Sequence, residues 1–158
     1  MANFKPGIGW VIRHAYLWWS EAHKGREEGL KDRPCVIVHT RTNEYQETEV
    51  YISPITHTPP EFPEKAMEIA QATKARLGLD SQASWIITTE ANRFIWPGPD
   101  IRTVPDGGLT YGHLPAAMTR DVIAQIRANA SDRSLRVVGR DDDVLNVKLR
   151  QRPKPKKT

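Results

Sequence analysis

The stretch that decides the fold runs from residue 33 to residue 57, with the sequence RPCVIVHTRTNEYQETEVYISPITH. Its first part, residues 34–40, is a short continuous apolar run, which predicts a buried central strand. Its last part, residues 47–55, alternates apolar and polar side chains up to a proline and predicts another strand. This region of the chain is therefore expected to form a β-sheet.

The segments on either side extend this prediction. Residues 9–19, GWVIRHAYLWW, predict a first strand, and residues 115–129 predict an amphipathic helix in which Met118, Val122 and Ile126 share one face. Further short elements are expected at 66–69 (strand), 71–77 (a helical turn ended by Gly78), 84–89, 92–96, 101–104 and 135–138 (strands). Many short strands and one late helix predict a mainly β (α+β) fold, a small curled sheet or barrel capped by the helix.

Composition places the chain among globular proteins. Its 158 residues include 39% hydrophobic residues, five tryptophans and one cysteine, Cys35. No apolar run reaches the roughly 20 residues that span a bilayer, and the first residues lack the apolar core of a secretion signal. We therefore expect a cytoplasmic protein without disulfides, not bound to membranes, and with one domain over residues 1–147.

The positive charge is concentrated at the end of the chain. The formal net charge is +4, but residues 148–158, KLRQRPKPKKT, hold six basic residues and no acid, which leaves 17 basic and 19 acidic residues in 1–147. Such a tail attracts nucleic acid without regard to its sequence. The alternative is a disordered end that serves solubility.

The chain lacks the sequence motifs of metal sites, phosphate-binding loops and serine-hydrolase nucleophiles. The five histidines are scattered without metal-ligand spacing, and no phosphate-binding glycine loop or nucleophile elbow is present. Cys35 lies inside an apolar run, as a buried structural thiol does. We therefore expect no metal and no cofactor.

Polar residues gather instead where the predicted strands begin or end. Arg33 precedes one strand and Thr56 and His57 follow the next, while Glu90, Asn92 and Arg93 follow a third. Arginine, threonine, histidine and glutamate together suit transfer of an RNA phosphodiester to the neighbouring ribose 2′-OH. That reaction needs a base, an acid and a cation for the phosphate, while the RNA supplies the nucleophile.

Three blocks in this order resemble the signature of the MazF/PemK growth-inhibitor family: GREEGLKDRPCVIV at 25–38, VYISPITHT at 50–58 and SWIITTEANRF at 84–94. The resemblance covers about residues 7–128. It implies an SH3-like barrel and a homodimer. It further implies a toxin that cuts single-stranded RNA without a metal, leaving 2′,3′-cyclic phosphate and 5′-OH ends. An acidic antitoxin, with which such toxins bind DNA, would neutralise it.

The resemblance assigns catalytic roles to the residues that match the blocks. Arg33 corresponds to the arginine that binds the scissile phosphate and assists the leaving group; its alternative is an ion pair with Asp32 or Glu28. Thr56 corresponds to a hydrogen-bond donor to a phosphate oxygen; its alternative is to cap a turn.

The acidic residue of the site has several candidates. Glu28 matches the acid of the first block, although Glu27 competes with it because this loop is one residue longer than the common pattern. Glu90 matches the aspartate of the third block and is a candidate base or ribose-positioning group; its alternative is an ion pair with Arg93. His57 is a further candidate for proton transfer, since histidine titrates near neutral pH.

Substrate binding is expected from His57, Asn92, Arg93 and Trp96, the tryptophan being a candidate for stacking on a base. The chain departs from the family pattern in its long Pro-rich insert between His57 and Ser84 and in the residues before the first strand. Two other functions stay open: a non-catalytic toxin like CcdB, which binds DNA gyrase, or a degenerate binding module of the same fold.

Overall fold

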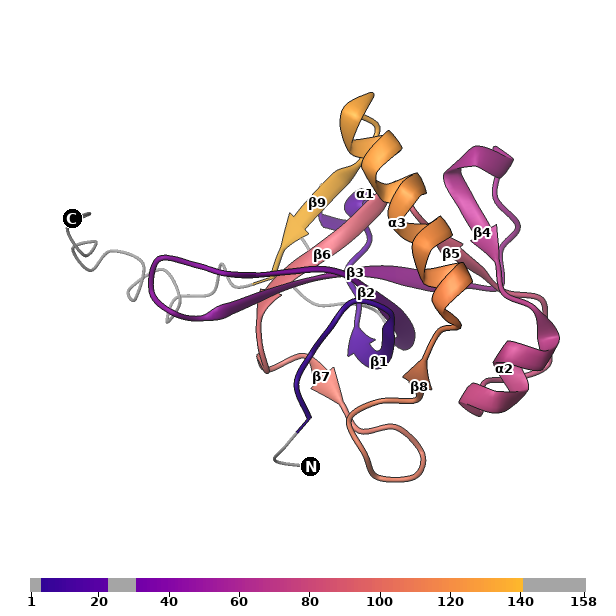
Figure 1. The fold of residues 1–158 in the computed structure, drawn as a ribbon, viewed down its shortest axis with the longest axis horizontal. Helices are drawn as coiled ribbons and strands as arrows, with labels where there is room; N and C mark the ends of the chain where they lie inside the picture. Colours follow the sequence, from indigo (N-terminus) through magenta and orange to yellow (C-terminus); the bar gives the residue numbers. More distant parts are fainter. Residues whose placement is uncertain (1–3, 23–30, 141–158) are drawn as a thin grey trace.

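A computed structural model describes residues 4–22 and 31–140 of the chain (Figure 1). Strands dominate it, and one long helix lies across the sheet (Figure 1). In chain order the elements are β1 (Trp10–Ala15), α1 (Trp19–Ala22), β2 (Asp32–Thr42), β3 (Thr48–Thr56), η1 (Pro63–Lys65), β4 (Ala66–Glu68), α2 (Gln71–Leu77), β5 (Trp85–Ile87), β6 (Glu90–Ile95), β7 (Ile101–Arg102), β8 (Gly112–His113), α3 (Ala116–Ser131) and β9 (Arg136–Gly139).

The two strands of the deciding stretch form a long antiparallel hairpin. Cys35 pairs with Pro54 at one end and Thr42 with Thr48 at the other, with a bulge between Ile37 and His39. Asn43 closes the turn, because its Oδ1 accepts hydrogen bonds from the backbone N–H of Tyr45 at 2.9 Å and of Glu47 at 3.0 Å. The hairpin projects from the body of the molecule (Figure 1).

The remaining strands extend this hairpin on both sides. Strand β1 pairs with β2, and β7 and β8 pair with β1. On the other side, the first half of β3 pairs with β6 and its end pairs with β5, which in turn pairs with β4. All these pairs are antiparallel, and only β9, among the described strands, joins in parallel, along β6. The expected mainly β class is confirmed, and these pairings leave the curled sheet open.

Two clusters of buried side chains fill the interior. One lies between the sheet and the two larger helices: Val11, Val36, Val38, Ile55, Ile69, Leu77, Ile86, Leu114 and Val122. The other lies on the opposite side of the central strands: Ile12, Tyr16, Cys35, Ile37, Val50, Ile52 and Phe94. Alternate residues of β1 and β2 therefore face different clusters, as the period of two in a strand requires. Cys35 is fully buried, and burial raises the pKa of its thiol, as expected for a structural cysteine.

The predicted first strand was too long. Strand β1 ends at Ala15, and Trp19–Ala22 form a short helix. At Leu17 the backbone N–H and C=O are satisfied by the side chain of Asn92, at 2.8 Å and 2.7 Å, instead of by a neighbouring strand. The apolar composition of residues 16–19 reflects burial of this turn, because Tyr16 and Leu17 are buried.

The helical predictions are confirmed, with small shifts at the ends. Gly78 ends α2 in the left-handed conformation with φ 73°, a conformation that costs glycine little. Pro115 caps α3 instead of occupying its first turn. Val122 of α3 is buried, and Met118 and Ile126 pack against the first cluster, as their spacing predicts.

The Pro-rich insert leaves the sheet after β3 and returns to it at β5. It contains η1, β4 and α2, and it rejoins where Trp85 pairs with Thr56. The expected single domain over 1–147 and the role of the 148–158 tail stay predictions, since residues 141–158 lie outside the described part. Within the described part, no helix is long and apolar enough to cross a membrane.

A buried histidine packs against the second cluster. His14 has no exposed surface, its ring packs against Phe94 with the centroids 4.7 Å apart, and neither ring nitrogen has a hydrogen-bond partner within the described structure. Burial, and then the positive charges of Arg140 and Arg102, lower the pKa of His14 from 6.5 to about 3. The folded protein therefore holds this imidazole neutral.

His14 should make the protein sensitive to acid. Its pKa is lower in the folded than in the unfolded chain, so the unfolded chain binds more protons and stability falls as the pH drops below 6.5 toward 3. In His14→Leu, we expect the free energy of unfolding to fall by about 2 kcal/mol less than in the wild type between pH 6 and pH 4. Urea unfolding at both pH values measures this, and equal pH dependence in the two proteins would contradict it.

Candidate functional site

A cavity of about 640 Å³ opens where β2 begins and β3 ends. Residues before and at the start of β2 form one wall, the end of β3 and the residues after it form another, and the segment from α2 to β5 closes a third. Its lining residues include Arg13, Trp18, Lys31, Arg33, Thr56, His57, Lys74, Asp80, Ser84 and Tyr111. The cavity thus gathers cations, hydroxyls, an imidazole and aromatic rings.

Arg33 brings a positive charge to this cavity. Its guanidinium lies over the Trp18 ring, 4.9 Å from the centroid, and NH1 donates a long hydrogen bond of 3.5 Å to the Ile55 carbonyl. The Nε atom is buried without a partner, and no carboxylate of the described residues forms an ion pair with this side chain. Burial lowers the pKa of Arg33, because desolvation disfavours the charged form. An anion in the cavity would compensate this charge.

Thr56 lies beside Arg33 for a geometric reason. Cys35 of β2 pairs with Pro54 of β3. In an antiparallel pair, Arg33, two residues before Cys35, therefore comes opposite Thr56, two residues after Pro54. Thr56 is half-buried, and its hydroxyl oxygen accepts a hydrogen bond from the Thr58 N–H at 3.2 Å. The hydroxyl hydrogen can therefore be donated to a bound group.

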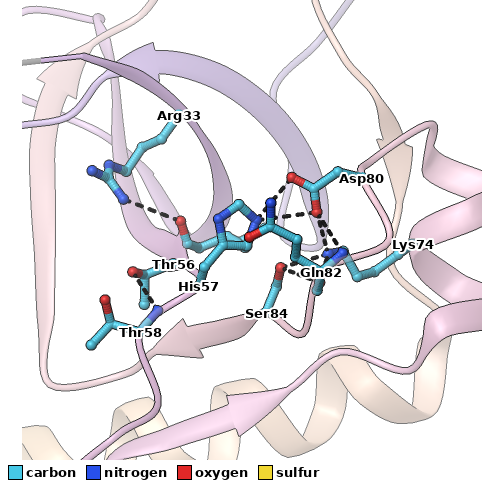
Figure 2. Close-up of polar contacts among 9 residues, drawn as sticks. Arg33, Thr56, His57, Thr58, Lys74, Asp80, Gln82 and Ser84 are labelled. Carbon is cyan, nitrogen blue, oxygen red and sulfur yellow. Dashed lines mark hydrogen bonds and ion pairs between the residues drawn. The ribbon is translucent and has the colours of Figure 1, made fainter.

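His57 follows Thr56 and is held by a residue of the insert. Its Nε2 atom lies 3.1 Å from Oδ1 and 2.8 Å from Oδ2 of Asp80 (Figure 2). About half of the His57 side chain, 47%, remains exposed, so a bound molecule can reach the ring. The structure thus brings Arg33, Thr56 and His57, all predicted from the sequence, into one cavity.

Asp80 is anchored in turn by a buried lysine. The side chain of Lys74 in α2 is 1% exposed, and its Nζ donates to Asp80 Oδ1 at 2.8 Å, to Ser84 Oγ at 2.6 Å and to the Gln82 carbonyl (Figure 2). Three oxygens therefore satisfy the three donors of the ammonium group. The hydrogen bond from Lys74 is the main cause that lowers the pKa of Asp80, which is consequently ionised at neutral pH.

Glu90 does not line the cavity and is connected to it through the rings of Tyr16 and Trp18. Its Oε1 accepts hydrogen bonds of 3.0 Å from the Tyr16 hydroxyl and from the Trp19 N–H. Tyr16 packs edge-on against Trp18, and Trp18 lines the cavity whereas Glu90 does not. Burial raises the pKa of Glu90, although the two hydrogen bonds and the charge of Arg33 oppose the rise. An ion pair with Arg93, the alternative to a functional role of Glu90, is not among its contacts.

The other predicted binding residues lie elsewhere. Asn92 is fully buried and its amide holds the backbone of Leu17. Arg93 lines a separate hollow of about 400 Å³ beside the β2–β3 hairpin. Trp96 is half-buried, with its ring 5.6 Å from Phe4. The structure therefore does not bring these three side chains to the cavity. Glu28 and its competitor Glu27 lie outside the described residues.

The sequence reasoning missed Lys74, Asp80 and Ser84. One signal was available: residues 73, 74 and 77 share a face of the short helix α2, and Thr73 and Leu77 are buried together with Lys74. A lysine on an apolar helix face requires a partner. Asp80 had no signal of its own, because an aspartate after a helix-ending glycine is common in loops. In the residues that the structure describes, no three His, Cys, Asp or Glu side chains form a group able to hold a metal ion.

Asn92 should matter for stability more than for substrate binding. In Asn92→Ala the buried N–H and C=O of Leu17 lose their partners, which should lower the free energy of unfolding by about 2–4 kcal/mol. The substitution Arg93→Ala, at the next residue of the chain, should change the free energy of unfolding by no more than about 0.5 kcal/mol. Urea unfolding of both variants decides this, and similar small changes in both would argue against the role of Asn92.

Comparison with known proteins adds a likeness in structure. No protein-family model matches the chain, and no curated protein matches it. Among solved structures the chain is similar to the Mycobacterium tuberculosis toxin MazF-mt6, with 22% sequence identity over 77% of this chain and 95% of that chain and a TM-score of 0.48. These values assign no function to this chain, so the role of the cavity is inferred from its own residues.

Proposed function

We propose that this chain is the toxin of a toxin–antitoxin pair and an endoribonuclease that cuts single-stranded RNA in the cavity of Arg33, Thr56 and His57. The observation that carries the proposal is the Arg33 guanidinium, which faces this cavity without a carboxylate partner among the described residues. Of the three sequence blocks that resemble the MazF/PemK family, the first two supply two walls of the same cavity and the third contributes Ser84 to its lining.

The reaction balances without any reagent besides the RNA. The ribose 2′-oxygen attacks the adjacent phosphorus, so a bond from phosphorus to the 2′-oxygen forms and the bond to the 5′-oxygen breaks. A base removes the proton from the 2′-OH, and an acid returns a proton to the departing 5′-oxygen. The products are a 2′,3′-cyclic phosphate and a 5′-OH.

Arg33 and Thr56 fit the phosphate in this scheme. The planar guanidinium donates two parallel hydrogen bonds to phosphate oxygens, and its charge offsets the negative charge that develops in the transition state. The Trp18 ring holds one face of the guanidinium and so limits its movement. The Thr56 hydroxyl adds a donor at the end of a rigid strand.

The same cavity suits an acidic inhibitor. Arg13, Lys31 and Arg33 line it, and a carboxylate-rich antitoxin segment would compete with RNA phosphates for these cations. We extend the proposal to such an antitoxin, and to a homodimer in the cytoplasm, on the strength of the family resemblance.

Loss of the Arg33 guanidinium should abolish cleavage. With 5′-labelled single-stranded RNA in EDTA, we expect Arg33→Ala to cut at least about 100-fold more slowly than the wild type, because its phosphate contact is gone. Arg33→Lys should recover only part of the rate, since an ammonium group lacks the fork geometry. Arg93→Ala, an arginine outside the cavity, serves as the matched control and should keep the wild-type rate.

Thermal unfolding verifies that each variant is folded. Full activity of folded Arg33→Ala would overturn the proposal. Growth arrest by the wild type with intact cellular RNA, and with gyrase bound, would instead identify a non-catalytic toxin like CcdB. Expression without any toxicity and without RNA cleavage would identify a binding module.

A further inference from the structure

We infer that His57 is the general base of the proposed cleavage and that Asp80, fixed by the buried Lys74, is its positioning residue. The inference rests on the proposed function and adds to it the group that accepts the 2′-OH proton. Sequence reasoning left this group open among Glu27, Glu28, Glu90 and His57.

The contact between His57 and Asp80 selects one form of the imidazole. Both carboxylate oxygens lie within 3.1 Å of Nε2, and the carboxylate is ionised because Lys74 lowers the pKa of Asp80. An ionised carboxylate only accepts hydrogen bonds, so Nε2 must carry the hydrogen. In the neutral ring the lone pair then lies on Nδ1, the nitrogen away from Asp80.

The imidazole stands between its carboxylate and the expected phosphate. Figure 2 shows the ring of His57 between Asp80 and the Arg33 guanidinium, and all three side chains line the same cavity. A phosphate held by Arg33 would present the neighbouring ribose to this part of the cavity. The arrangement of carboxylate, imidazole and reacting hydroxyl is the one by which a carboxylate orients a histidine base.

The buried Lys74 explains how the exposed side chains of His57 and Asp80 are held in one relative orientation. The side chains of His57 and Asp80 are 47% and 52% exposed, and an exposed ion pair alone holds two side chains only weakly. Lys74 has 1% of its side chain exposed, and it also binds Ser84 and the Gln82 carbonyl, so its position is determined by α2 and by the start of β5. Asp80 is therefore tied to the rigid part of the insert.

Glu90 is the acidic candidate for the base that lies within the described residues, and its carboxylate already has hydrogen-bond partners. Glu90 accepts hydrogen bonds from Tyr16 and Trp19 and does not line the cavity. The charged groups that face the His57 side of the cavity are Asp80 and Lys74 from the insert, Arg33, Lys31 and Asp32 from β2 and the residue before it, and Arg13 from β1. Among the described lining residues, His57 is the one with an imidazole side chain, which can accept a proton on one nitrogen while it donates from the other.

The first test reads the imidazole directly, without activity. Nitrogen-15 NMR of histidine-labelled protein above pH 8, with His57→Gln used to assign the signal, should show His57 protonated at Nε2 in the wild type. In Asp80→Asn this preference should weaken, while Glu68→Gln, an exposed acid of the same insert outside the cavity, should leave it unchanged. A wild-type ring protonated at Nδ1 would overturn the inference.

The second test separates binding from proton transfer. His57→Gln should lower kcat about 100-fold or more with little change in KM, and should remove the acidic limb of the pH–rate profile. Asp80→Asn should lower kcat and move that limb to lower pH, because the negative charge that favours the protonated ring is lost. Glu68→Gln should keep the wild-type rate and profile. Thermal unfolding shows that each variant remains folded.

The outcomes distinguish this inference from the proposed function. If Arg33→Ala abolishes cleavage while His57→Gln keeps the wild-type rate and acidic limb, His57 is not the base and the proposed function stands. If kcat falls in Asp80→Asn without any displacement of the limb, Asp80 has only a structural role and the inference fails. A wild-type protein that cuts no RNA overturns both.

Discussion

Strand β3 is paired along both of its edges, and this double pairing determines where the site lies. One edge carries β2 over nearly its whole length, whereas the other carries β6 first and β5 afterwards. The exchange of partners occurs near Pro54, which lacks an N–H for a ladder and is therefore suited to such a point. Beyond it the end of β3 pairs with β5 up to Thr56, and Thr56 and His57 border the cavity at this end of the strand.

The chemistry of the cavity follows from this geometry and from a balance of charge. The antiparallel register places Arg33 opposite the end of β3, and Trp18 packs on the guanidinium. The insert supplies a carboxylate with a fixed position, because the buried cation Lys74 holds Asp80 against His57. Among the described residues, four cations and two carboxylates line this solvent-accessible space, an excess of positive charge that favours a further anion.

Local patterns in the sequence predicted much of the fold, whereas distant contacts were beyond them. The hairpin strands, the end of α2 at Gly78 and the apolar face of α3 follow from periodicity and from glycine. The end of β1 does not, because it depends on Asn92, 75 residues from Leu17. For the site, strand ends indicated Arg33, Thr56 and His57, but they also indicated Asn92, because a polar residue near a strand boundary can equally tie down a turn. Asp80 escaped prediction since only the folded position of Lys74 gives it a role.

The insert begins and ends at adjacent points of the sheet, since Thr56 and Trp85 face each other across paired strands. A tight turn of a few residues would bridge the same gap, so the pairing of β3 with β5 does not require an insert of this length. Evolution can therefore lengthen, shorten or exchange this excursion while the strands that carry Arg33 and Thr56 keep their places. In the proposed function, the strands that bind the phosphate and the insert that positions the base could then change independently of each other.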